Sequence, residues 1–379
     1  MEVRYFDNSA TTRIKEEVLT EMFPYLSREY GNPSSLYSIG RKSKRAIEEA
    51  RKRVASLINC KPEEIYFTSC GSESDNTALK GIAYANKNKG KHIITSKIEH
   101  PAILHSCQNL ENKGFEVTYL DVDKDGFVNL ETLENSIRPD TILISIMFAN
   151  NEIGTIEPIE QIGKIAKEHN ILFHTDSVQA IGNVKIDVNK MNIDMLSMSA
   201  HKFYGPKGIG VLYIREGIKC NKLQDGGHQE RELRAGTENV AGIVGLGKAI
   251  EIAYKNFDEY NSKLTNLRNY YISEINEKIP NTKLNGSIKY RLPGNANISF
   301  KGVDGESLLL NLDMEGICAS SGSACSTGQN TPSHVLLAIG VPSSLAYGAL
   351  RVTLGEENSK EDIDYLVEKL TKIVEKLRS

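Results

Sequence analysis

The fold is decided by residues 141–176, which read TILISIMFANNEIGTIEPIEQIGKIAKEHNILFHTD. The runs Thr141–Met147 and Ile171–Thr175 have the length and apolar character of buried β-strands. Between them, Ile159–His169 repeats its apolar residues with the 3.6-residue period of an amphipathic helix. A strand, a helix and a second strand in this order predict two parallel strands joined by a helical crossover.

The same alternation extends on both sides of this unit, from about residue 43 to residue 215. It predicts an α/β fold with a mostly parallel, seven-stranded sheet covered by helices on both faces. The last two strands are joined through Gly205-Pro206-Lys207-Gly208, which is also compatible with a local hairpin or a wide turn. The other expected strands are Ile65–Thr68, His92–Ser96, Val117–Leu120, Met195–Ser199 and Gly210–Ile214, and the other expected helices are Ser43–Ile58, Ser74–Asn86 and Ala102–Asn112.

The C-terminal third has a different pattern and predicts a smaller α+β domain. Residues 215–238 are polar and glycine-bearing, as in a long loop, and Val240 to about Ile279 is expected to form one helix with few interruptions. We expect a large domain over residues 15–255 and a small domain over residues 1–14 and 256–379. The small domain is expected to contain strands Asn297–Phe300 and Leu350–Thr353 and helices Glu306–Met314 and Lys360–Leu377.

Composition excludes several classes of partner. The chain has 379 residues, and its 46 basic and 49 acidic residues give a net charge of 46 − 49 = −3, which provides no electrostatic basis for binding nucleic acid or an anionic membrane. No apolar run approaches the roughly 18 residues of a membrane span, and the N-terminus does not resemble a secretory signal. The six cysteines have irregular spacings that fit neither a zinc site nor a disulfide scaffold, so a reducing cytoplasm is expected.

Polar residues follow five of the expected strands directly. Because ligands of open α/β sheets bind beyond the carboxyl ends of the strands, these residues predict a small-molecule site at one rim. A serine at such a position is, taken alone, more often a helix cap than a ligand. The residues are Ser69 to Ser72, Glu99 and His100, Asn150 to Glu152, Asp176 and Gln179, and Ser199, His201 and Lys202.

The residue types at this rim suggest a small phosphorylated cofactor. Cys70-Gly71-Ser72 leads into a helix, whose first backbone N–H groups bind anions, but the chain has neither a Walker P-loop nor a Gly-x-Gly-x-x-Gly turn after a strand. Lys202 in a dry pocket would be a nucleophilic amine, although it could also be a surface lysine, and Lys207 is its nearest competitor. Asp176 ends an apolar strand and needs a cationic partner, either a protonated ring nitrogen or an internal Arg or Lys.

The motifs resemble those of the fold-type I pyridoxal-phosphate enzymes, and more narrowly those of the class V aminotransferase family and its group I cysteine desulfurases (the NifS/IscS type). The resemblance extends over nearly the whole chain, and its lysine segment alone indicates only the cofactor class. The combination with the Ser-Gly-Ser-Ala-Cys loop is highly specific. The matching segments include Tyr5 to Thr12, Gly31 to Ser35, Phe67 to Asn76, Glu99 to Ala102, Asn150 to Gly154, His174 to Gln179, Ser199 to Gly208, Arg234 to Asn239, Ser320 to Cys325 and Leu350 to Gly355.

The resemblance implies a role for each residue of the site. Lys202 would bind pyridoxal 5'-phosphate covalently, His100 would stack on its ring and transfer protons, and Asp176 would keep the ring nitrogen protonated. Arg351 would hold the substrate carboxylate. Gln179 and Asn151 would contact the ring and its surroundings, Gly71, Ser72, Ser199 and His201 would hold the phosphate, and Thr237 would reach the phosphate of a partner subunit in a homodimer.

The implied reaction converts L-cysteine to L-alanine and transfers the sulfur to Cys325 as a persulfide. Cys325 lies in the segment 319–331, where six of thirteen residues are Ser or Gly, so we expect a mobile loop that carries sulfur outwards. The expected acceptor is a protein, such as the scaffold for iron–sulfur cluster assembly. The other five cysteines are expected to be structural, including Cys318, and no metal is expected.

Some positions depart from the family pattern. Cys70 stands where the family usually has glycine, and His228 and Glu232 replace glycines of a Gly-Gly-Gly-Gln-Glu-Arg-Gly loop, which leaves their effect on substrate access open. Alternative functions are a selenocysteine lyase, another lyase or aminotransferase of the same fold, and a non-catalytic sulfur carrier. The presence of both Lys202 and Cys325 counts against the non-catalytic alternative.

Overall fold

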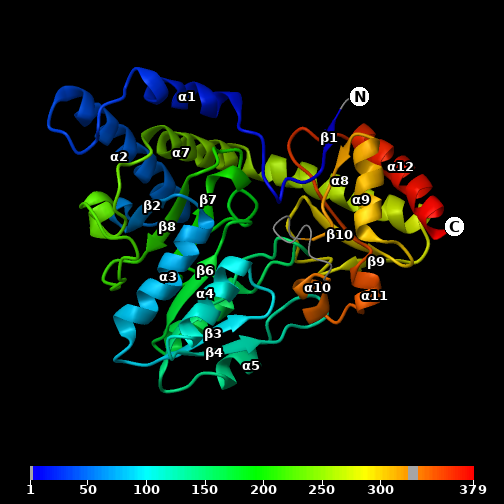
Figure 1. Ribbon diagram of the computed structural model, residues 1–379, viewed down its shortest axis with the longest axis horizontal. Helices are drawn as coiled ribbons and strands as arrows, with labels where there is room; N and C mark the ends of the chain where they lie inside the picture. The colour runs from blue at the N-terminus through cyan, green and yellow to red at the C-terminus, as the bar shows by residue number, and fades with distance from the viewer. Residues whose placement is uncertain (1–2, 323–331) are drawn as a thin grey trace.

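The computed structural model describes residues 3–322 and 332–379 (Figure 1). Two groups of elements lie side by side: a larger group around a seven-stranded sheet, and a smaller group around a three-stranded sheet with the C-terminal helix on its outside. In the larger sheet the strands follow one another in space as β2 (Ile65–Thr68), β8 (Gly210–Ile214), β7 (Met195–Ser199), β6 (Leu172–Asp176), β5 (Thr141–Ser145), β3 (His92–Ser96) and β4 (Glu116–Leu120).

Six strands of the larger sheet share one direction. Neighbours from β7 to β4 are parallel, and β8 runs antiparallel to both β2 and β7. The predicted seven-stranded, mostly parallel sheet is therefore confirmed. The last two strands form the antiparallel pair that the turn sequence left open, with Ser199 opposite Gly210.

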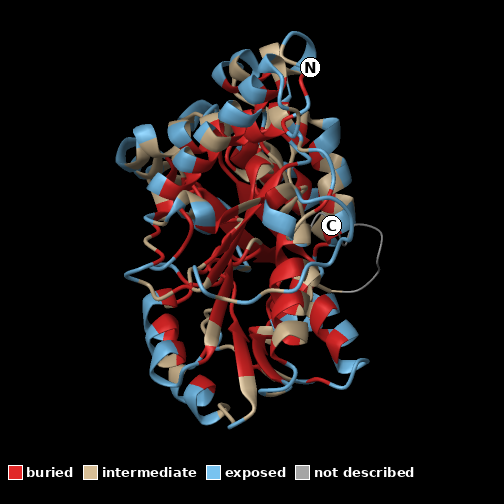
Figure 2. Ribbon diagram, turned by 90° about the vertical axis from the view of Figure 1, so that its left-hand side faces the viewer, coloured by how far each residue is buried: buried red, intermediate tan, exposed pale blue. Residues whose placement is uncertain are grey.

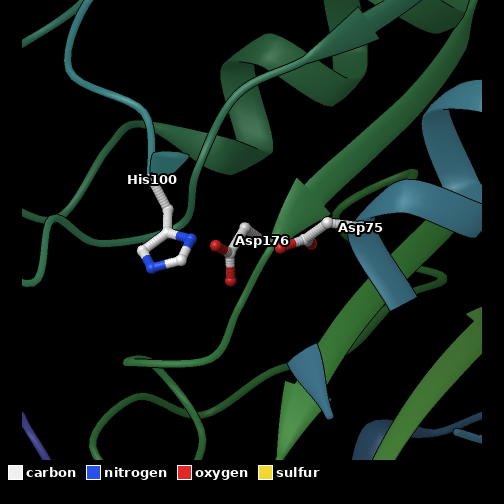
Figure 3. Close-up of side chains that lie close together, drawn as sticks. All are labelled: Asp75, His100 and Asp176. Carbon is white, nitrogen blue, oxygen red and sulfur yellow. The ribbon is translucent and has the colours of Figure 1, made fainter. Parts of the chain in front are cut away.

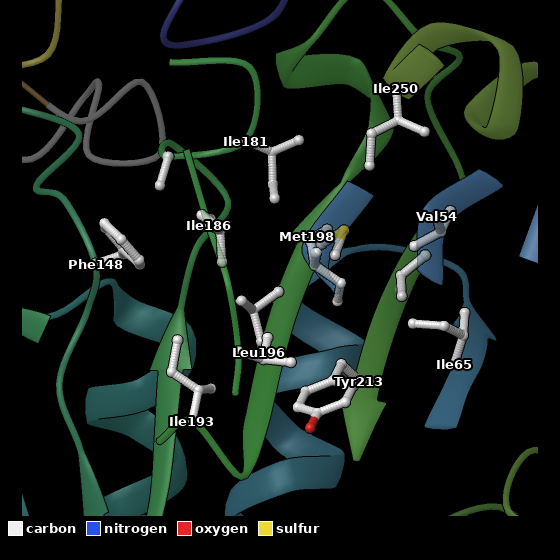
Figure 4. Packing of buried hydrophobic residues seen from close by; sticks show 14 of the residues in the cluster. Val54, Ile65, Phe148, Ile181, Ile186, Ile193, Leu196, Met198, Tyr213 and Ile250 are labelled. Atoms are coloured by element: carbon white, nitrogen blue, oxygen red, sulfur yellow. The ribbon is translucent and has the colours of Figure 1, made fainter. Parts of the chain in front are cut away.

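Helices cover both faces of this sheet, as expected. Side chains alternate between faces along a strand, so Leu196 of β7 packs with Val54 and Ile250 in one apolar core (Figure 4), whereas Met195 packs with Leu79 in another. Buried residues fill the sheet, and exposed residues line the outer faces of the helices (Figure 2). The helices are α1 (Glu16–Ser27), α2 (Ser38–Ile58), α3 (Gly71–Asn86), α4 (Pro101–Glu111), α5 (Leu130–Asn135), α6 (Ile159–Glu168) and α7 (Val240–Lys255), with 3-10 turns η1 (Pro62–Glu64), η2 (Ala200–Lys202) and η3 (Gln229–Glu232).

The smaller group has its own apolar core, which includes Phe6 from the beginning of the chain and Leu350 and Leu366 from its end. Its three-stranded sheet is antiparallel, and a separate pair of strands, β1 and β11, is parallel. This packing supports the predicted domains, whose boundaries stay a prediction. The elements are β1 (Arg4–Tyr5), α8 (Phe257–Lys278), β9 (Thr282–Asn285), β10 (Asn295–Phe300), α9 (Gly305–Met314), β11 (Ile317–Cys318), α10 (His334–Ala338), α11 (Ser343–Ala346), β12 (Ala349–Thr353) and α12 (Lys360–Arg378).

The stretch from Val240 to about Ile279, predicted as helix with few interruptions, is helical with one interruption, at Asn256 between α7 and α8. Asn256 has φ −119° and ψ 35°, which are not helical values, and its carbonyl accepts the Tyr260 N–H at the start of α8. Helix α1 was not predicted. Within the described ranges, no helix combines the length and the apolar character that crossing a bilayer requires.

Candidate active site

The carboxyl ends of the parallel strands surround a cavity of about 220 Å³. Three of its walls come from the turns after β2, β6 and β7, and β12 of the smaller group supplies a fourth. This arrangement is the one expected for an open α/β sheet. Ten of the twelve predicted site residues line the cavity: Gly71, Ser72, His100, Asn151, Asp176, Gln179, Ser199, His201, Lys202 and Arg351.

Lys202 enters the cavity from η2, the single turn that follows β7. Its Nζ donates hydrogen bonds to the backbone carbonyls of Ser9 at 2.5 Å and Ala10 at 2.7 Å. Lys207, the alternative nucleophile, is exposed and does not line the cavity. Of the two lysines, Lys202 is therefore the one whose amine can react with a bound molecule.

Asp176, at the end of β6, is a buried carboxylate beside His100 and Asp75 (Figure 3). Ligand atoms of the three side chains lie within 4.8 Å of one another. Burial raises the pKa of Asp176, and the charges of His100 and Lys202 act in the opposite direction. Burial and the neighbouring Asp176 also raise the pKa of Asp75, so the two carboxyls do not ionise together easily. A cation beside Asp176 would relieve this repulsion.

His100 has a defined tautomer when its ring is neutral. It is the N-cap of α4, and its Nδ1 accepts the Ala102 backbone N–H at 3.1 Å. The proton of the neutral ring therefore lies on Nε2. This contact also holds the ring over the cavity beside Asp176 (Figure 3).

The part of the cavity at the start of α3 is suited to an anion. Helix α3 begins there at Gly71, and its N-cap residue Cys70 makes no side-chain hydrogen bond to the helix. A Cβ on Gly71 would come within 2.7 Å of Val178 Cγ2, so only glycine fits without displacement. Burial and the nearby Lys202 lower the pKa of His201 to about 4, so its ring is neutral at pH 7.

Arg351 is the charged residue of the cavity that comes from the smaller group. It lies on β12, and its side chain is 1% exposed. Its Nη1 donates to the Asn151 carbonyl at 3.2 Å, and its Nη2 donates to Asp7 Oδ1 at 2.7 Å. A guanidinium at this position can bind a carboxylate with two parallel hydrogen bonds.

These residues fit a phosphorylated, positively charged pyridine ring with an aldehyde. The start of α3 with Ser72 would hold the phosphate, Asp176 would face the ring nitrogen, and Lys202 would bind the aldehyde. One buried oxygen that faces the cavity, Asp75 Oδ1, has no hydrogen-bond partner among the described residues, as is common where a ligand belongs.

Some predicted residues lie elsewhere. Glu99, Asn150 and Glu152 were expected at the rim but do not line the cavity; Glu99, for example, accepts hydrogen bonds from Ser96 and Met147. Thr237 is exposed and lies outside the cavity. Cys325 lies outside the described residues.

The five described cysteines are all free thiols. Burial raises the pKa of Cys60 and Cys220 to about 12 and also raises that of Cys107 and Cys318. These four are therefore poor nucleophiles near neutral pH. Cys70 differs, because it lines the cavity.

Other residues in or next to the cavity were not predicted as functional. Ser9 contacts Lys202 only through its backbone carbonyl, across 193 residues of sequence. No residue type or spacing in the sequence indicates such a backbone contact. Asp7 belongs to a conspicuous motif, but its contact with Arg351 spans 344 residues. Asp75 did have a signal: it shares one helix face with the apolar Leu79 and Ile82, and a carboxylate on an apolar face demands a partner.

Known proteins resemble this chain along nearly its whole length. The family model described as Aminotransferase class-V matches residues 4–366. A protein named "Cysteine desulfurase IscS" from Clostridium botulinum is 60% identical over 99% of this chain and 95% of its own length. A protein of the same name from Methanosarcina thermophila is 58% identical over 99% of this chain and 93% of its own length. A solved structure titled "NIFS-LIKE PROTEIN" has 40% identity and a TM-score of 0.93, and the match covers 99% of this chain and 100% of that one.

Proposed function

This chain belongs to the aminotransferase class-V family, and we propose that it acts as a cysteine desulfurase that uses pyridoxal 5'-phosphate. The observation that carries the proposal is the single cavity in which Lys202, Asp176, the start of α3 and Arg351 come together. These groups can bind an aldehyde, a ring cation, a phosphate and a carboxylate, which are the features of the cofactor and of an amino-acid substrate.

When bound, the cofactor supplies an electron sink conjugated to the substrate's α-carbon. Asp176 holds the ring nitrogen protonated, and Arg351 orients the substrate by its carboxylate. The Lys202 amine and His100, through Nε2, would move protons at the substrate carbons. Arg351 and Asp176 come from different sheets, so the cavity places the substrate between the two groups of elements.

Cys325 would complete the reaction as the nucleophile. Its thiolate attacks the sulfur of the bound substrate, so an S–S bond forms and the C–S bond breaks. The electron pair of the C–S bond returns to the substrate skeleton, which gains a proton and leaves as L-alanine. Cys325 then holds a persulfide for a protein acceptor, for which we propose an iron–sulfur scaffold in a reducing cytoplasm, where the persulfide is not trapped as a disulfide.

A homodimer would complete the site, with Thr237 of one subunit at the phosphate of the other. Exposed apolar side chains on and after α1 support a surface that a second subunit covers. Phe23 is 60% exposed and Leu36 is 89% exposed. Thr237 is itself exposed and outside its own cavity, as this proposal requires.

The test measures alanine and sulfide from L-cysteine with cofactor and a thiol reductant. Wild type should form both, and Cys325→Ala should lose sulfide release by at least about 100-fold. Cys70→Ala, which removes the thiol that lines the cavity, is the matched control and should stay active. Absence of alanine from wild type would exclude a desulfurase, and sulfide release undiminished by Cys325→Ala would exclude the persulfide. Lys202→Ala should bind the cofactor without the yellow covalent form.

A further inference from the structure

Asp7 binds the cavity arginine with one carboxylate oxygen and Ser320 with the other. Its Oδ1 accepts from Arg351 Nη2 at 2.7 Å, and its Oδ2 accepts from Ser320 Oγ at 2.8 Å. The side chain is only 14% exposed. The backbones of Ser320 and Arg351 also pair with each other, so the three residues form one closed unit.

Arg351 needs this carboxylate because its charge is buried. An unpaired buried guanidinium is costly, and Asp7 is the one carboxylate that pairs with it in the described part of the chain. The Arg351 Nε has no hydrogen-bond partner among the described residues. The guanidinium is thus held through both Nη atoms, by Asp7 and by the Asn151 carbonyl, and the Asp7 contact is the only charged one among the described residues.

We propose that Asp7 is a positioning residue for substrate recognition: it fixes the Arg351 guanidinium in the orientation that receives the substrate carboxylate. This inference rests on the proposed function, in which Arg351 binds that carboxylate. Asp7 does not itself line the cavity, so it acts through Arg351. Without Asp7, the guanidinium keeps its charge and its contact with the Asn151 carbonyl but loses the charged contact that fixes its orientation, so binding of carboxylates weakens.

The structure provides a graded set of variants. Asp7→Ala removes both contacts of the carboxylate. Asp7→Asn keeps an oxygen that can accept from Arg351 and removes the charge. Ser320→Ala removes only the other partner of Asp7 and leaves the contact with Arg351, so it is the matched control.

The experiment titrates the cofactor-loaded enzyme with L-alanine and with ethylamine, which is alanine without its carboxylate, and follows the cofactor's absorbance. Asp7→Ala should weaken L-alanine binding by about 10-fold, because a charge-assisted contact is lost, and leave ethylamine binding unchanged. Asp7→Asn should fall between wild type and Asp7→Ala, and Ser320→Ala should stay within about 2-fold of wild type. In turnover, KM for L-cysteine should rise by the same factor while kcat changes little.

The outcomes separate this inference from the proposed function. Equal weakening of both ligands by Asp7→Ala, or an unchanged affinity for L-alanine, overturns the role of Asp7. If wild type binds the cofactor and L-alanine but forms no alanine from L-cysteine, the proposed function fails while the binding comparison still tests Asp7. If Asp7→Ala does not fold, Asp7→Asn provides the test. The inference still requires that its affinity for L-alanine falls more than its affinity for ethylamine.

Discussion

Among single residues, Glu157 is a buried carboxyl with few partners. Its Oε2 accepts the Val128 N–H at 3.1 Å, and its Oε1 has no partner among the described residues. Burial raises the pKa of Glu157 from 4.5 to about 8. Between pH 4.5 and about 8, Glu157 is therefore protonated in the folded protein, whereas the unfolded chain has released this proton. The stability that the group contributes is fully present below pH 4.5 and is lost as the pH rises to about 8.

Glu157→Gln is neutral at every pH and keeps an oxygen for Val128. We expect it to raise the Tm of the cofactor-free protein at pH 8 by on the order of 2 °C and to leave the Tm at pH 4.5 nearly unchanged. Thermal unfolding at the two pH values measures the difference, with the exposed Glu160→Gln as control. A shift of equal size at both pH values would contradict the assigned pKa.

At the level of elements, the polypeptide between β8 and α7 contains unusual backbone geometry. Glu230, Arg231 and Glu232 have φ values of 45°, 54° and 69°, in the left-handed region that favours glycine. A buried ion pair between Arg51 and Glu230, 2.8 Å long, holds this segment against α2. Glu232 is the position where the family pattern has glycine, so the replacement introduces strain without preventing the fold.

Glu232→Gly should relieve part of that strain. We expect the free energy of unfolding to rise by about 1 kcal/mol, since a side chain in left-handed geometry costs about that amount. The exposed contact with His228 that is lost contributes little. Urea unfolding measures the change. Glu131→Gly, in the first turn of α5, is the control and should lower stability, and a loss for both variants would contradict the strain.

Elements with a clear apolar pattern were predictable from the sequence, and the interruption of a continuous helical pattern was not. Strands β2, β3, β7 and β8 have the predicted bounds, because each is a brief apolar run bounded by polar residues or turns. The break at Asn256 escaped prediction because the helical pattern continues on both sides of it. The rim residues were predictable because strand ends converge by topology, whereas Asp7 reaches the site through tertiary contacts alone.

At the scale of the whole molecule, the proposed dimer predicts that two inactive variants can complement each other. Lys202→Ala lacks the nucleophile, and Thr237→Asp would place a negative charge at the partner's phosphate. In a mixed dimer, one of the two sites receives an intact Lys202 and an intact Thr237. Co-expressed variants should therefore regain about a quarter of the wild-type activity. Each variant alone serves as the control, and no recovery in an isolated mixed dimer would exclude the shared site.

The segment from Asp7 to Ala10 has a consequence for how the protein is made. It is synthesised before its partners at the site, which lie 170 to 344 residues later in the sequence. A nascent chain that has completed the seven-stranded sheet still lacks β11 and β12, which hold this segment and supply the arginine. A complete substrate pocket therefore forms only after β12 has left the ribosome, and a ribosome-stalled chain ending near residue 300 would expose an unfinished cavity.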